Sequence, residues 1–382
     1  MKRILFIATR NPYSGRFSGD VIGSLKIINF LKKKYKVDVV AIGDKKSNLK
    51  KRILYFKQSN YFLKIFYALY SLLRLKPLQF GFFFSKKMKI HVEKTAKNYD
   101  LLFFYHIRSS QYLPKKFDGK TIIEMGDLYS YNYFQTFCNL NIFNPLKYIY
   151  LLESFLIKKI EKKIFLFFDK IILFSIYETK KINKVFRKKI ININISISSI
   201  QKKYSYSLNN NKILFIGNLN YLPNLLAVKD FIKNSFSIIK KKIPGTKFYI
   251  IGSINKLDKF FLSFKKDVVI LGQKNNVEKY LKNSICGLAN LRVATGIQGK
   301  VLTYMSYGLP VICSKKVSSN FNNNVITYNN NNDLIKKIIN LKNNKKLSND
   351  FSRKSLKFIK KFSDNRISPE YLKITQFNKK HS

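Results

Sequence analysis

Acidic residues are scarce in this sequence. Its 382 residues include 20 aspartates and glutamates against 73 lysines and arginines, which gives a formal net charge of +53. Three explanations are open for this excess: nucleic-acid binding, docking on an anionic membrane surface, and a compositional bias toward lysine, asparagine and isoleucine. The lysines are spread along the chain and no RNA- or DNA-binding signature interrupts them, so we expect no specific nucleic-acid partner. An anionic membrane surface is the partner that we expect instead.

Cysteine is also rare, and its spacing is uninformative about pairing. The three cysteines are Cys138, Cys286 and Cys313, and two of them lie in apolar runs. They have neither disulfide-framework nor metal-ligand spacing, which favours structural thiols in a reducing cytoplasm. No HExxH, Cys/His cluster, DxD or GxSxG motif occurs, so we expect no metal and no resident cofactor.

Long uncharged apolar runs are missing as well. The N-terminal "MKRILFIATRNPYSG" has too short an apolar core for a secretory signal and continues into a turn. The most apolar long window is 61–84, which Lys64, Arg74 and Lys76 interrupt. A membrane span needs about 20 uncharged apolar residues, so this window predicts an amphipathic helix for an interface or a core.

What the sequence does contain is a repeated strand–helix pattern. The first half opens with strand "RILFIAT", a Gly/Ser loop "RNPYSGRFSGD", a helix and strand "KVDVVAIG", followed by strands at 100–107, 120–127 and 169–175. The pattern restarts at "KILFIGN" (212–218) and continues through "KFYIIGS", "VVILGQ", "ICGLANL" and "PVICS". Strands that alternate with helices predict an α/β fold with parallel sheets, here two Rossmann-like domains facing a cleft.

The polar stretch around 200–212 has no periodicity, and we interpret it as a linker between the two domains. We therefore expect an N-terminal domain at 1–203 and a C-terminal domain at 204–362. The tail at 363–382 is predicted to pack back on the N-terminal domain.

The segment "RVATGIQGKVLTYMSYGLPVI" (292–312) resembles a phosphate-binding turn that leads into a short helix. The helix is expected to begin near Gln298 or Gly299 and to stop at Gly308 in a left-handed conformation. Free backbone N–H groups and the positive end of the helix dipole favour an anion there, and Lys300 and Arg292 add positive charge. A diphosphate site and an ordinary glycine turn with two surface cations are both compatible with this spacing.

The motifs together resemble a known family. "LANLRVATGIQGKVLTYMSYGLPVICS", preceded by "FIGNLNYLPNLLAVKDF", "IPGTKFYIIGS" and "VVILGQKNNVEKYL", is similar to the C-terminal domain of GT-B sugar-nucleotide glycosyltransferases of group 1, which are family 4-like. "RNPYSGRFSGD", "KPLQF", "YHIRSSQYL" and "IIEMGDLYS" are similar to members that build bacterial surface polysaccharides. The similarity extends over about residues 2 to 360 and is most specific at 290–312.

The resemblance implies a hexosyltransferase-type enzyme that moves a sugar from a nucleotide-sugar to a lipid-linked or polysaccharide acceptor. Transfer would be retaining and metal-independent, in the cytoplasm at the inner membrane face. The Gly loop with Gly19 and Asp20 would close over sugar and acceptor, and the base or ribose would lie near Gln273. The residues implied for donor binding are Gly217, Asn218, Arg292, Thr295, Gly296, Gln298, Gly299, Lys300 and Thr303.

Asp127 and His106, each at the carboxyl end of a predicted strand, are the candidate catalytic residues. Asp127 lies where many relatives have a catalytic-pocket histidine, and its carboxylate would orient the acceptor hydroxyl or take up its proton. The alternative for Asp127 is a cap for the helix that follows. His106 comes at the end of strand 100–107, where a catalytic and a structural role are both open. Glu153 and Glu161 are expected on a solvated helix face among lysines.

The sequence departs from the family at two positions. Relatives commonly carry two glutamates eight positions apart, which here are Thr295 and Thr303, and the second normally binds the ribose hydroxyls. A threonine lacks the charge-assisted hydrogen bond of a carboxylate, worth about 1.5 to 3 kcal/mol. Besides an active enzyme, a weak or inactive GT-B scaffold of a glycan assembly system therefore remains an alternative.

Overall fold

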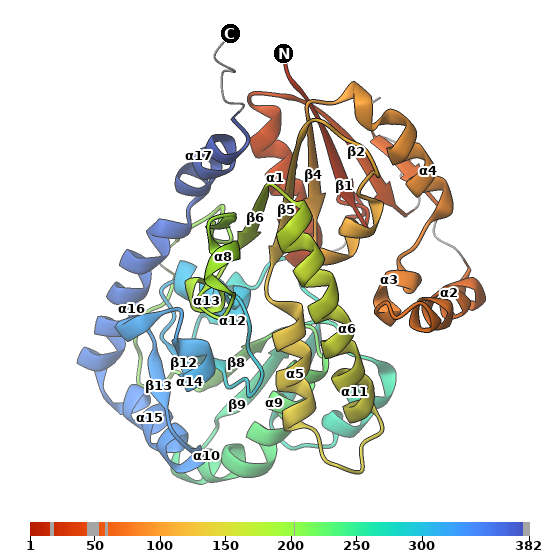
Figure 1. Ribbon diagram of the computed structural model, residues 1–382. Helices are drawn as coiled ribbons and strands as arrows, with labels where there is room; N and C mark the ends of the chain where they lie inside the picture. The colour runs from red at the N-terminus through yellow and green to blue at the C-terminus, as the bar shows by residue number, and fades with distance from the viewer. Residues whose placement is uncertain (16–18, 44–52, 58–59, 202, 377–382) are drawn as a thin grey trace. The chain divides into compact units, whose positions relative to one another are not determined.

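The computed structural model describes residues 1–15, 19–43, 53–57, 60–201 and 203–376 (Figure 1). The chain forms two compact units, the first made of residues 1–196 and 365–382 and the second of residues 197–364. The predicted boundaries were placed after residues 203 and 362, a few residues from these divisions.

Unit 1 is built on a parallel sheet of seven strands in the order β3-β2-β1-β4-β5-β6-β7. The strands are β1 Arg3–Ala8, β2 Lys36–Ile42, β3 Ile53–Phe56, β4 Leu101–Tyr105, β5 Lys120–Gly126, β6 Lys170–Leu173 and β7 Ile190–Asn192. The helices are α1 Gly19–Lys32, α2 Tyr61–Leu73, α3 Leu78–Phe82, α4 Lys86–Thr95, η1 Ala96–Asn98, η2 Ile107–Tyr112, α5 Tyr129–Asn139, α6 Leu146–Phe167, α7 Ile176–Thr179, α8 Lys184–Arg187 and α17 Asp364–Ile374.

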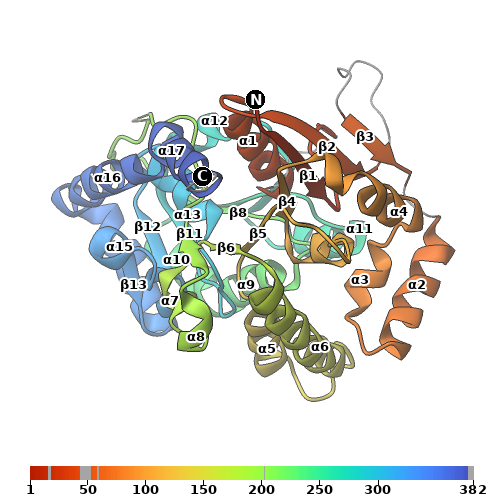
Figure 2. The ribbon, with the colours of Figure 1, turned by 45° about the horizontal axis from the view of Figure 1, so that its top comes forward.

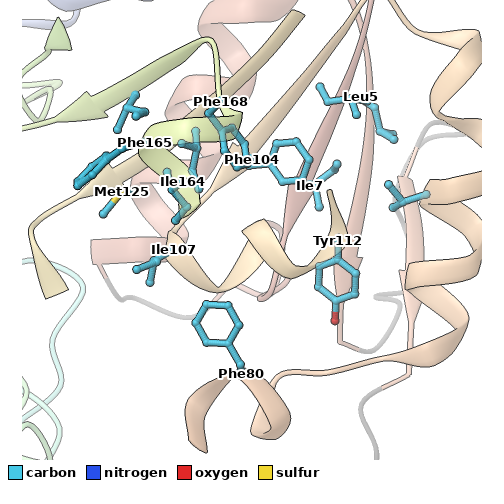
Figure 3. Packing of buried hydrophobic residues seen from close by; sticks show 14 of the residues in the cluster. Leu5, Ile7, Phe80, Phe104, Ile107, Tyr112, Met125, Ile164, Phe165 and Phe168 are labelled. Atoms are coloured by element: carbon cyan, nitrogen blue, oxygen red, sulfur yellow. The ribbon is translucent and has the colours of Figure 1, made fainter. Parts of the chain in front are cut away.

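Both faces of this sheet are buried, which explains why its strands read as continuous apolar runs. Successive strand residues point to opposite faces, so Leu5 and Phe104 enter one core while Phe6 and Phe103 enter the other. The first core is closed by side chains from α3, α4, η2 and α6 (Figure 3). The second is closed by α1 and α17.

The C-terminal helix α17 is part of unit 1. Its Ile367 is fully buried in the second core, and the Tyr371 hydroxyl donates to Glu124 Oε2 at 2.5 Å. Two long-range bonds continue this anchoring, because Tyr35 Oη and Lys120 Nζ donate to the carbonyls of Thr375 and Ile374. The last described turn of the chain is therefore fixed to the sheet.

The expectation of a solvated face at Glu153 and Glu161 was wrong. Both glutamates are buried, at 4% and 3% exposure. Glu153 Oε1 accepts from the N–H of Leu78 at the start of α3, and Glu161 Oε1 accepts from the N–H of Ser130 in the first turn of α5. The two carboxylates thus satisfy orphan N–H groups of neighbouring helices, while the lysines of α6 face solvent.

The apolar window 61–84 forms two short helices, α2 and α3, instead of one. Gly81 allows this turn, because a Cβ there would lie 1.9 Å from the carbonyl oxygen of Tyr67. Most large apolar side chains of α2 are exposed. Within the described residues, no helix has the length and apolarity needed to cross a membrane.

Unit 2 contains a parallel sheet of six strands in the order β10-β9-β8-β11-β12-β13 (Figure 2). The strands are β8 Lys212–Ile216, β9 Lys247–Ile251, β10 Val268–Gly272, β11 Ser284–Ala289, β12 Val311–Ser314 and β13 Ile326–Tyr328. The helices are α9 Leu222–Phe231, η3 Ile232–Phe236, α10 Ser237–Lys242, α11 Lys256–Ser263, α12 Glu278–Leu281, α13 Gly299–Ser306, α14 Lys315–Ser318, η4 Asn322–Asn324, α15 Asn331–Asn343, α16 Lys345–Ile359 and η5 Lys360–Phe362.

The cysteines have two kinds of environment. Cys286 and Cys313 are fully buried in β11 and β12, and burial raises the pKa of both thiols well above the ordinary value. They are structural thiols, as expected from their apolar runs. Cys138 is exposed near the end of α5.

Candidate functional site

The loop after β8 comes close to the loop after β9 at the carboxyl ends of two neighbouring strands. The N–H of Gly217 donates to Ile251 O at 2.9 Å, and the N–H of Leu219 donates to Ser253 O at 2.7 Å. A Cβ at Gly252 would lie 1.8 Å from the Gly217 carbonyl oxygen, so only glycine fits there. Asn218 Oδ1 accepts from Ser253 Oγ at 2.9 Å, which fixes the turn at Gly217 and Asn218.

Helix α13 begins at Gly299, as the sequence predicted, and its first turn carries no acidic residue. Gln298 is the N-cap residue, but its side chain does not cap the helix and instead donates from Nε2 to Thr295 O at 2.8 Å. Gly296 has a φ of +58°, and Asn320 Nδ2 donates to its carbonyl at 2.8 Å. The positive end of the helix dipole therefore has no carboxylate in its own first turn.

Lys300 connects these two elements. Its ammonium donates to Asn224 Oδ1 at 2.7 Å, and Asn224 Nδ2 donates to Asn218 O at 2.8 Å. The Lys300 Nζ also lies 3.9 Å from the centre of the Phe215 ring and within 3.2 Å of the position that a Cβ on Gly217 would take. Burial lowers the pKa of Lys300 to about 7, with a small opposing effect of Cys313.

A hydroxyl in the middle of α13 fixes the helix to the sheet. Tyr304 Oη accepts from the N–H of Ile216 at 2.7 Å and lies 3.2 Å from the carbonyl of Leu214. The Tyr304 ring packs on Gly287 of β11, where a Cβ would approach the ring to 2.4 Å. The start of α13 is thereby held beside the end of β8, and Lys300 is brought to the Gly217 turn.

Thr303 and Arg292, two of the predicted donor residues, both reach solvent, and each has a partner within unit 2. Thr303 is on the solvent side of α13, and its hydroxyl donates to Gly299 O at 3.0 Å. That leaves its oxygen as an acceptor, which is the role a ribose-binding carboxylate would have. Arg292 forms an ion pair with Asp230 Oδ1 at 2.7 Å, with 63% of its side chain exposed. Gln273 directly follows β10 and is exposed.

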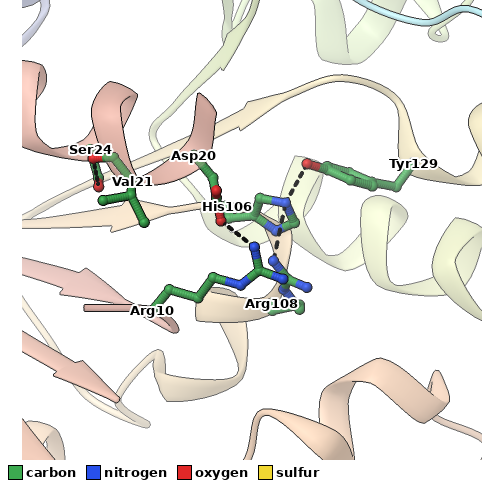
Figure 4. A network of polar contacts seen from close by, with 7 residues as sticks. All are labelled: Arg10, Asp20, Val21, Ser24, His106, Arg108 and Tyr129. Atoms are coloured by element: carbon green, nitrogen blue, oxygen red, sulfur yellow. Dashed lines mark hydrogen bonds and ion pairs between the residues drawn. The ribbon is translucent and has the colours of Figure 1, made fainter. Parts of the chain in front are cut away.

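In unit 1, His106 lies in a polar cluster at the end of β4 (Figure 4). Its φ is +73°, a strained value for a residue other than glycine. Its Nε2 lies 2.5 Å from Tyr129 Oη and 3.4 Å from Arg108 Nη2. Burial lowers the pKa of His106 well below its ordinary value, and the positive charges of Arg108 and Arg10 lower it further.

The tautomer of His106 follows from these contacts. The Arg108 guanidinium only donates, so Nε2 accepts and the proton of the neutral ring is assigned to Nδ1. Nδ1 is buried and has no hydrogen-bond partner among the residues that the structure describes. With Nε2 held by Tyr129 and Arg108, the ring fits a positioning role for Tyr129 better than that of a general base.

Asp127 lies one residue after the end of β5, close to Glu124 and Tyr129. Its charge raises the pKa of both neighbours, in each case less than burial does. The N-cap position of α5 is Leu128, whose N–H donates to Glu178 Oε2 at 3.0 Å, so Glu178 is a buried carboxylate partner of that helix start. Asp20 in α1 accepts from Arg10 Nη1 at 2.5 Å, and Gly19 is the first residue of the helix.

The structure brings Gly217, Asn218 and Lys300 together in unit 2. It adds Asn224, which sequence reasoning did not single out because one asparagine in a lysine- and asparagine-rich chain carries no signal. Residues 16–18 of the predicted Gly loop lie outside the described residues. Arg108 and Tyr129 were likewise missed as partners of His106, since their link to it depends on tertiary contacts.

Comparison with known proteins gives a family match within unit 2 and structural neighbours for the whole chain. Residues 210–344 match the family described as "Glycosyl transferases group 1". Among curated proteins, none matches the sequence. Among solved structures, TarM is similar with a TM-score of 0.66 at 14% identity, over 98% of each chain. HepE from Anabaena, in complex with UDP and glucose, is similar with a TM-score of 0.64 at 13% identity, over 98% of this chain and 99% of its own.

The chain has the GT-B glycosyltransferase fold. The lipopolysaccharide outer core galactosyltransferase WaaB is a further GT-B neighbour, with a TM-score of 0.54 at 14% identity over 97% of this chain and 98% of its own. The α/β class and GT-B fold predicted from the sequence are confirmed. The group 1 match extends over most of unit 2 and includes the Gly217 turn, Lys300 and α13.

Proposed function

We propose that this chain is a glycosyltransferase that moves a sugar from a nucleotide-sugar to a lipid-linked or polysaccharide acceptor in cell-surface glycan biosynthesis. The observation that carries the proposal is the convergence in unit 2 of the Gly217 turn, the start of α13 and the Lys300 ammonium. A glycine turn, a helix N-terminus and a cation are the groups that bind a diphosphate. The neighbours support this choice, because TarM and HepE have both been seen in complex with UDP.

The proposed reaction replaces one bond at the anomeric carbon with another. The bond from that carbon to the donor phosphate oxygen breaks, and the acceptor oxygen bonds to the same carbon with retention. Lys300 and the α13 dipole stabilise the charge on the departing diphosphate, a role that requires no metal ion. The acceptor hydroxyl gives up its proton, for which we propose Asp127 as orienting group or acceptor, with His106 holding Tyr129 beside it.

The remaining predicted residues have supporting roles in this proposal. Thr303 accepts from a ribose hydroxyl through the oxygen that is left after its bond to Gly299. Arg292 reaches the diphosphate only by leaving Asp230, so we assign it a secondary role. Gly19 and Asp20 belong to the acceptor side, where Arg10 holds Asp20.

Nucleotide binding is the direct test of the proposal. In thermal-shift screening of the full chain against UDP- and GDP-sugars, one nucleotide class should raise the melting temperature. Lys300→Ala should abolish that shift, whereas Lys316→Ala, an exposed lysine on α14, should keep it. Transfer of radiolabelled sugar to extracted glycolipid would then report the reaction itself. If saturation-transfer NMR showed no contact with any nucleotide, the proposal that the chain is a glycosyltransferase would be refuted.

A catalytically weak or inactive GT-B scaffold is the second candidate, and Thr303 is the observation that favours it. Thr303→Glu restores the carboxylate of the family, and Thr303→Val removes the hydroxyl while keeping the shape. If the protein is an active enzyme, the native form should transfer sugar, and Thr303→Val should bind nucleotide more weakly than the native form. A scaffold should bind nucleotide weakly or not at all in the native form, and should show no transfer in either variant.

We further propose that the protein works in the cytoplasm at the inner face of the membrane, where a lipid-linked acceptor would be available. The excess of positive charge supports an anionic membrane surface as the partner.

A further inference from the structure

Helix α2 exposes an unusually apolar face for a helix on a protein surface. Phe62 and Leu73 are each 83% exposed, and Phe66 is 60% exposed. The full set, named here the α2 face, is Tyr61, Phe62, Leu63, Ile65, Phe66, Leu69, Tyr70 and Leu73. Phe62, Phe66, Leu69 and Leu73 follow one another at helical spacing, so they form one side of the helix. Solvent exposure of so many large apolar groups indicates a surface that binds something.

A second apolar surface lies on the hairpin formed by α5 and α6, which run side by side in Figures 1 and 2. Phe143, in the loop between the helices, is 91% exposed. The full set, named here the α5–α6 tip, is Phe134, Ile142, Phe143, Leu146, Tyr148, Ile149, Leu152 and Phe155.

The two surfaces belong to neighbouring parts of unit 1. Helix α3 follows α2 directly and packs against it at Gly81. The other side of α3 contacts the hairpin, since Gln79 Nε2 lies 3.2 Å from Tyr133 Oη of α5 and the N–H of Leu78 donates to Glu153 Oε1 of α6 at 2.5 Å. The α2 face and the α5–α6 tip are thus held in a fixed relation by α3.

The charges around these surfaces have one sign. Residues 60–92 contain no acidic residue, and residues 128–168 contain only Glu153 and Glu161, which are both buried. The exposed charged residues in the two segments are Arg74, Lys76, Lys86, Lys87, Lys158, Lys159, Lys162 and Lys163. Within these two segments every exposed charge is therefore positive.

We propose that the α2 face and the α5–α6 tip together dock on an anionic lipid bilayer. Exposed phenylalanines and leucines next to lysines are the composition of interfacial helices, whose apolar side enters the boundary between headgroups and acyl chains. The lysines and Arg74 then lie at the level of the lipid phosphates, where each contributes to binding. These lysines and Arg74, named here the positive rim, select an anionic surface. The aromatic and aliphatic side chains add binding that salt alone does not remove.

This inference names the membrane partner of the proposed glycosyltransferase and gives it a surface. The proposed function supplies only the reason why the protein would dock on a membrane. Bilayer binding itself needs neither a donor nor catalysis. A protein with this surface and no transferase activity would still bind vesicles. The two proposals can therefore fail separately.

The test is co-sedimentation of the full chain with vesicles of phosphatidylcholine alone and of phosphatidylcholine mixed with phosphatidylglycerol. We expect strong binding to the mixed vesicles only. The double variant Phe62→Ser with Leu73→Ser should lower the partition coefficient at least about tenfold, since each side chain loses the free energy of burial in the bilayer. Lys158→Gln with Lys162→Gln should weaken binding at low salt and reduce its salt dependence.

The matched control is Leu257→Ser with Phe264→Ser, which removes two comparably exposed apolar side chains, at 67% and 69%, from unit 2. This control should bind vesicles like the native protein. Equal loss of binding in both double variants would overturn the assignment of the surface. Equal binding to neutral and anionic vesicles would overturn the choice of an anionic bilayer.

Self-association is the competing use of the same surface, and it gives a different result. The competing result would be a native protein that is a dimer by light scattering and does not bind vesicles, and that becomes monomeric in Phe62→Ser with Leu73→Ser. In that case the surface is an interface between copies and the proposal is wrong. Sugar transfer to a water-soluble acceptor analogue, measured without vesicles, should be equal in the native protein and the α2 variant.

Discussion

At the scale of single residues, Lys300 has an environment that makes its charge depend on pH near neutrality. Its side chain is half-buried, with the ammonium beside Asn224 and the Phe215 ring, and desolvation lowers its pKa to about 7. A bound diphosphate would favour the charged form and raise that pKa, so nucleotide binding should take up a proton above pH 7. The affinity for nucleotide should then fall by up to about tenfold per pH unit above pH 7.

Isothermal titration calorimetry at pH 6, 7 and 8 in buffers of different ionisation enthalpy measures this proton uptake. Lys300→Gln should bind more weakly at pH 6 and lose the pH dependence. A native protein whose affinity is constant from pH 6 to pH 8 would contradict a role of Lys300 at the diphosphate.

Glu124 gives a pH dependence of stability with a definite sign. Its carboxyl is buried under α17, and burial raises its pKa to about 8, although the Tyr371 hydroxyl lowers it. The native state therefore keeps a proton that the unfolded chain releases near pH 4.5. This contribution to stability is full below that pH and is lost as the pH rises toward 8, at roughly 1.4 kcal/mol per pH unit.

Glu124→Gln removes this titration while keeping the shape and an acceptor for Tyr371. Urea unfolding at several pH values between 5.5 and 8 should show that the variant gains stability relative to the native protein as the pH rises. Glu370→Gln, which changes an exposed glutamate next to Tyr371, is the matched control and should give a much smaller change. Parallel curves for Glu124→Gln and the native protein would contradict the buried, protonated carboxyl.

At the scale of secondary-structure elements, α17 should contribute to unit 1 and not to unit 2. Ile367 is fully buried against the sheet of unit 1, and Ile338 of α15 is fully buried in unit 2. Truncating a buried isoleucine to alanine costs about 2 to 5 kcal/mol. Ile367→Ala should therefore speed amide hydrogen exchange in β1 and β4, and Ile338→Ala should speed it in β11 and β12.

Exchange followed by mass spectrometry at peptide resolution distinguishes the two variants. Equal acceleration of amide exchange in β11, β12, β1 and β4 by Ile367→Ala would show that the two units unfold together. It would contradict the prediction that α17 stabilises unit 1 alone.

Elements were predictable from the sequence where they are long and uniformly apolar. The strands β1, β4 and β8 are largely continuous apolar runs. The turn signals at Gly296 and Gly308 are confirmed by positive φ values. The edge strands β3, β7 and β13 were missed, because they have only three or four residues.

The candidate site was predictable only in part, for a physical reason. Lys300 was predicted from its charge near a helix start and Gly217 from the resemblance to the family. Their link through Asn224, however, depends on side-chain contacts between separate elements. The same limit applies to Glu153 and Glu161. Their neighbours in sequence are lysines, whereas their partners are backbone N–H groups at the starts of other helices.

At the scale of the whole molecule, the excess of positive charge acts on the fold itself. With 20 acidic residues for 73 lysines and arginines, most cations have no carboxylate to pair with. Repulsion among them should destabilise the native state at low ionic strength, and salt should relieve it as the Debye length falls from about 10 Å at 0.1 M to about 3 Å at 1 M. The melting temperature should therefore rise when sodium chloride is added.

The same salt should weaken the attraction between the positive rim of unit 1 and anionic vesicles. The two effects have opposite signs, so loss of vesicle binding at high salt cannot result from unfolding if the melting temperature has risen. Differential scanning fluorimetry and vesicle co-sedimentation over one sodium chloride series measure both. A melting temperature that falls with salt would mean that favourable ion pairs, such as Lys229 with Asp258, outweigh the repulsion and that the excess charge is tolerated by local pairing.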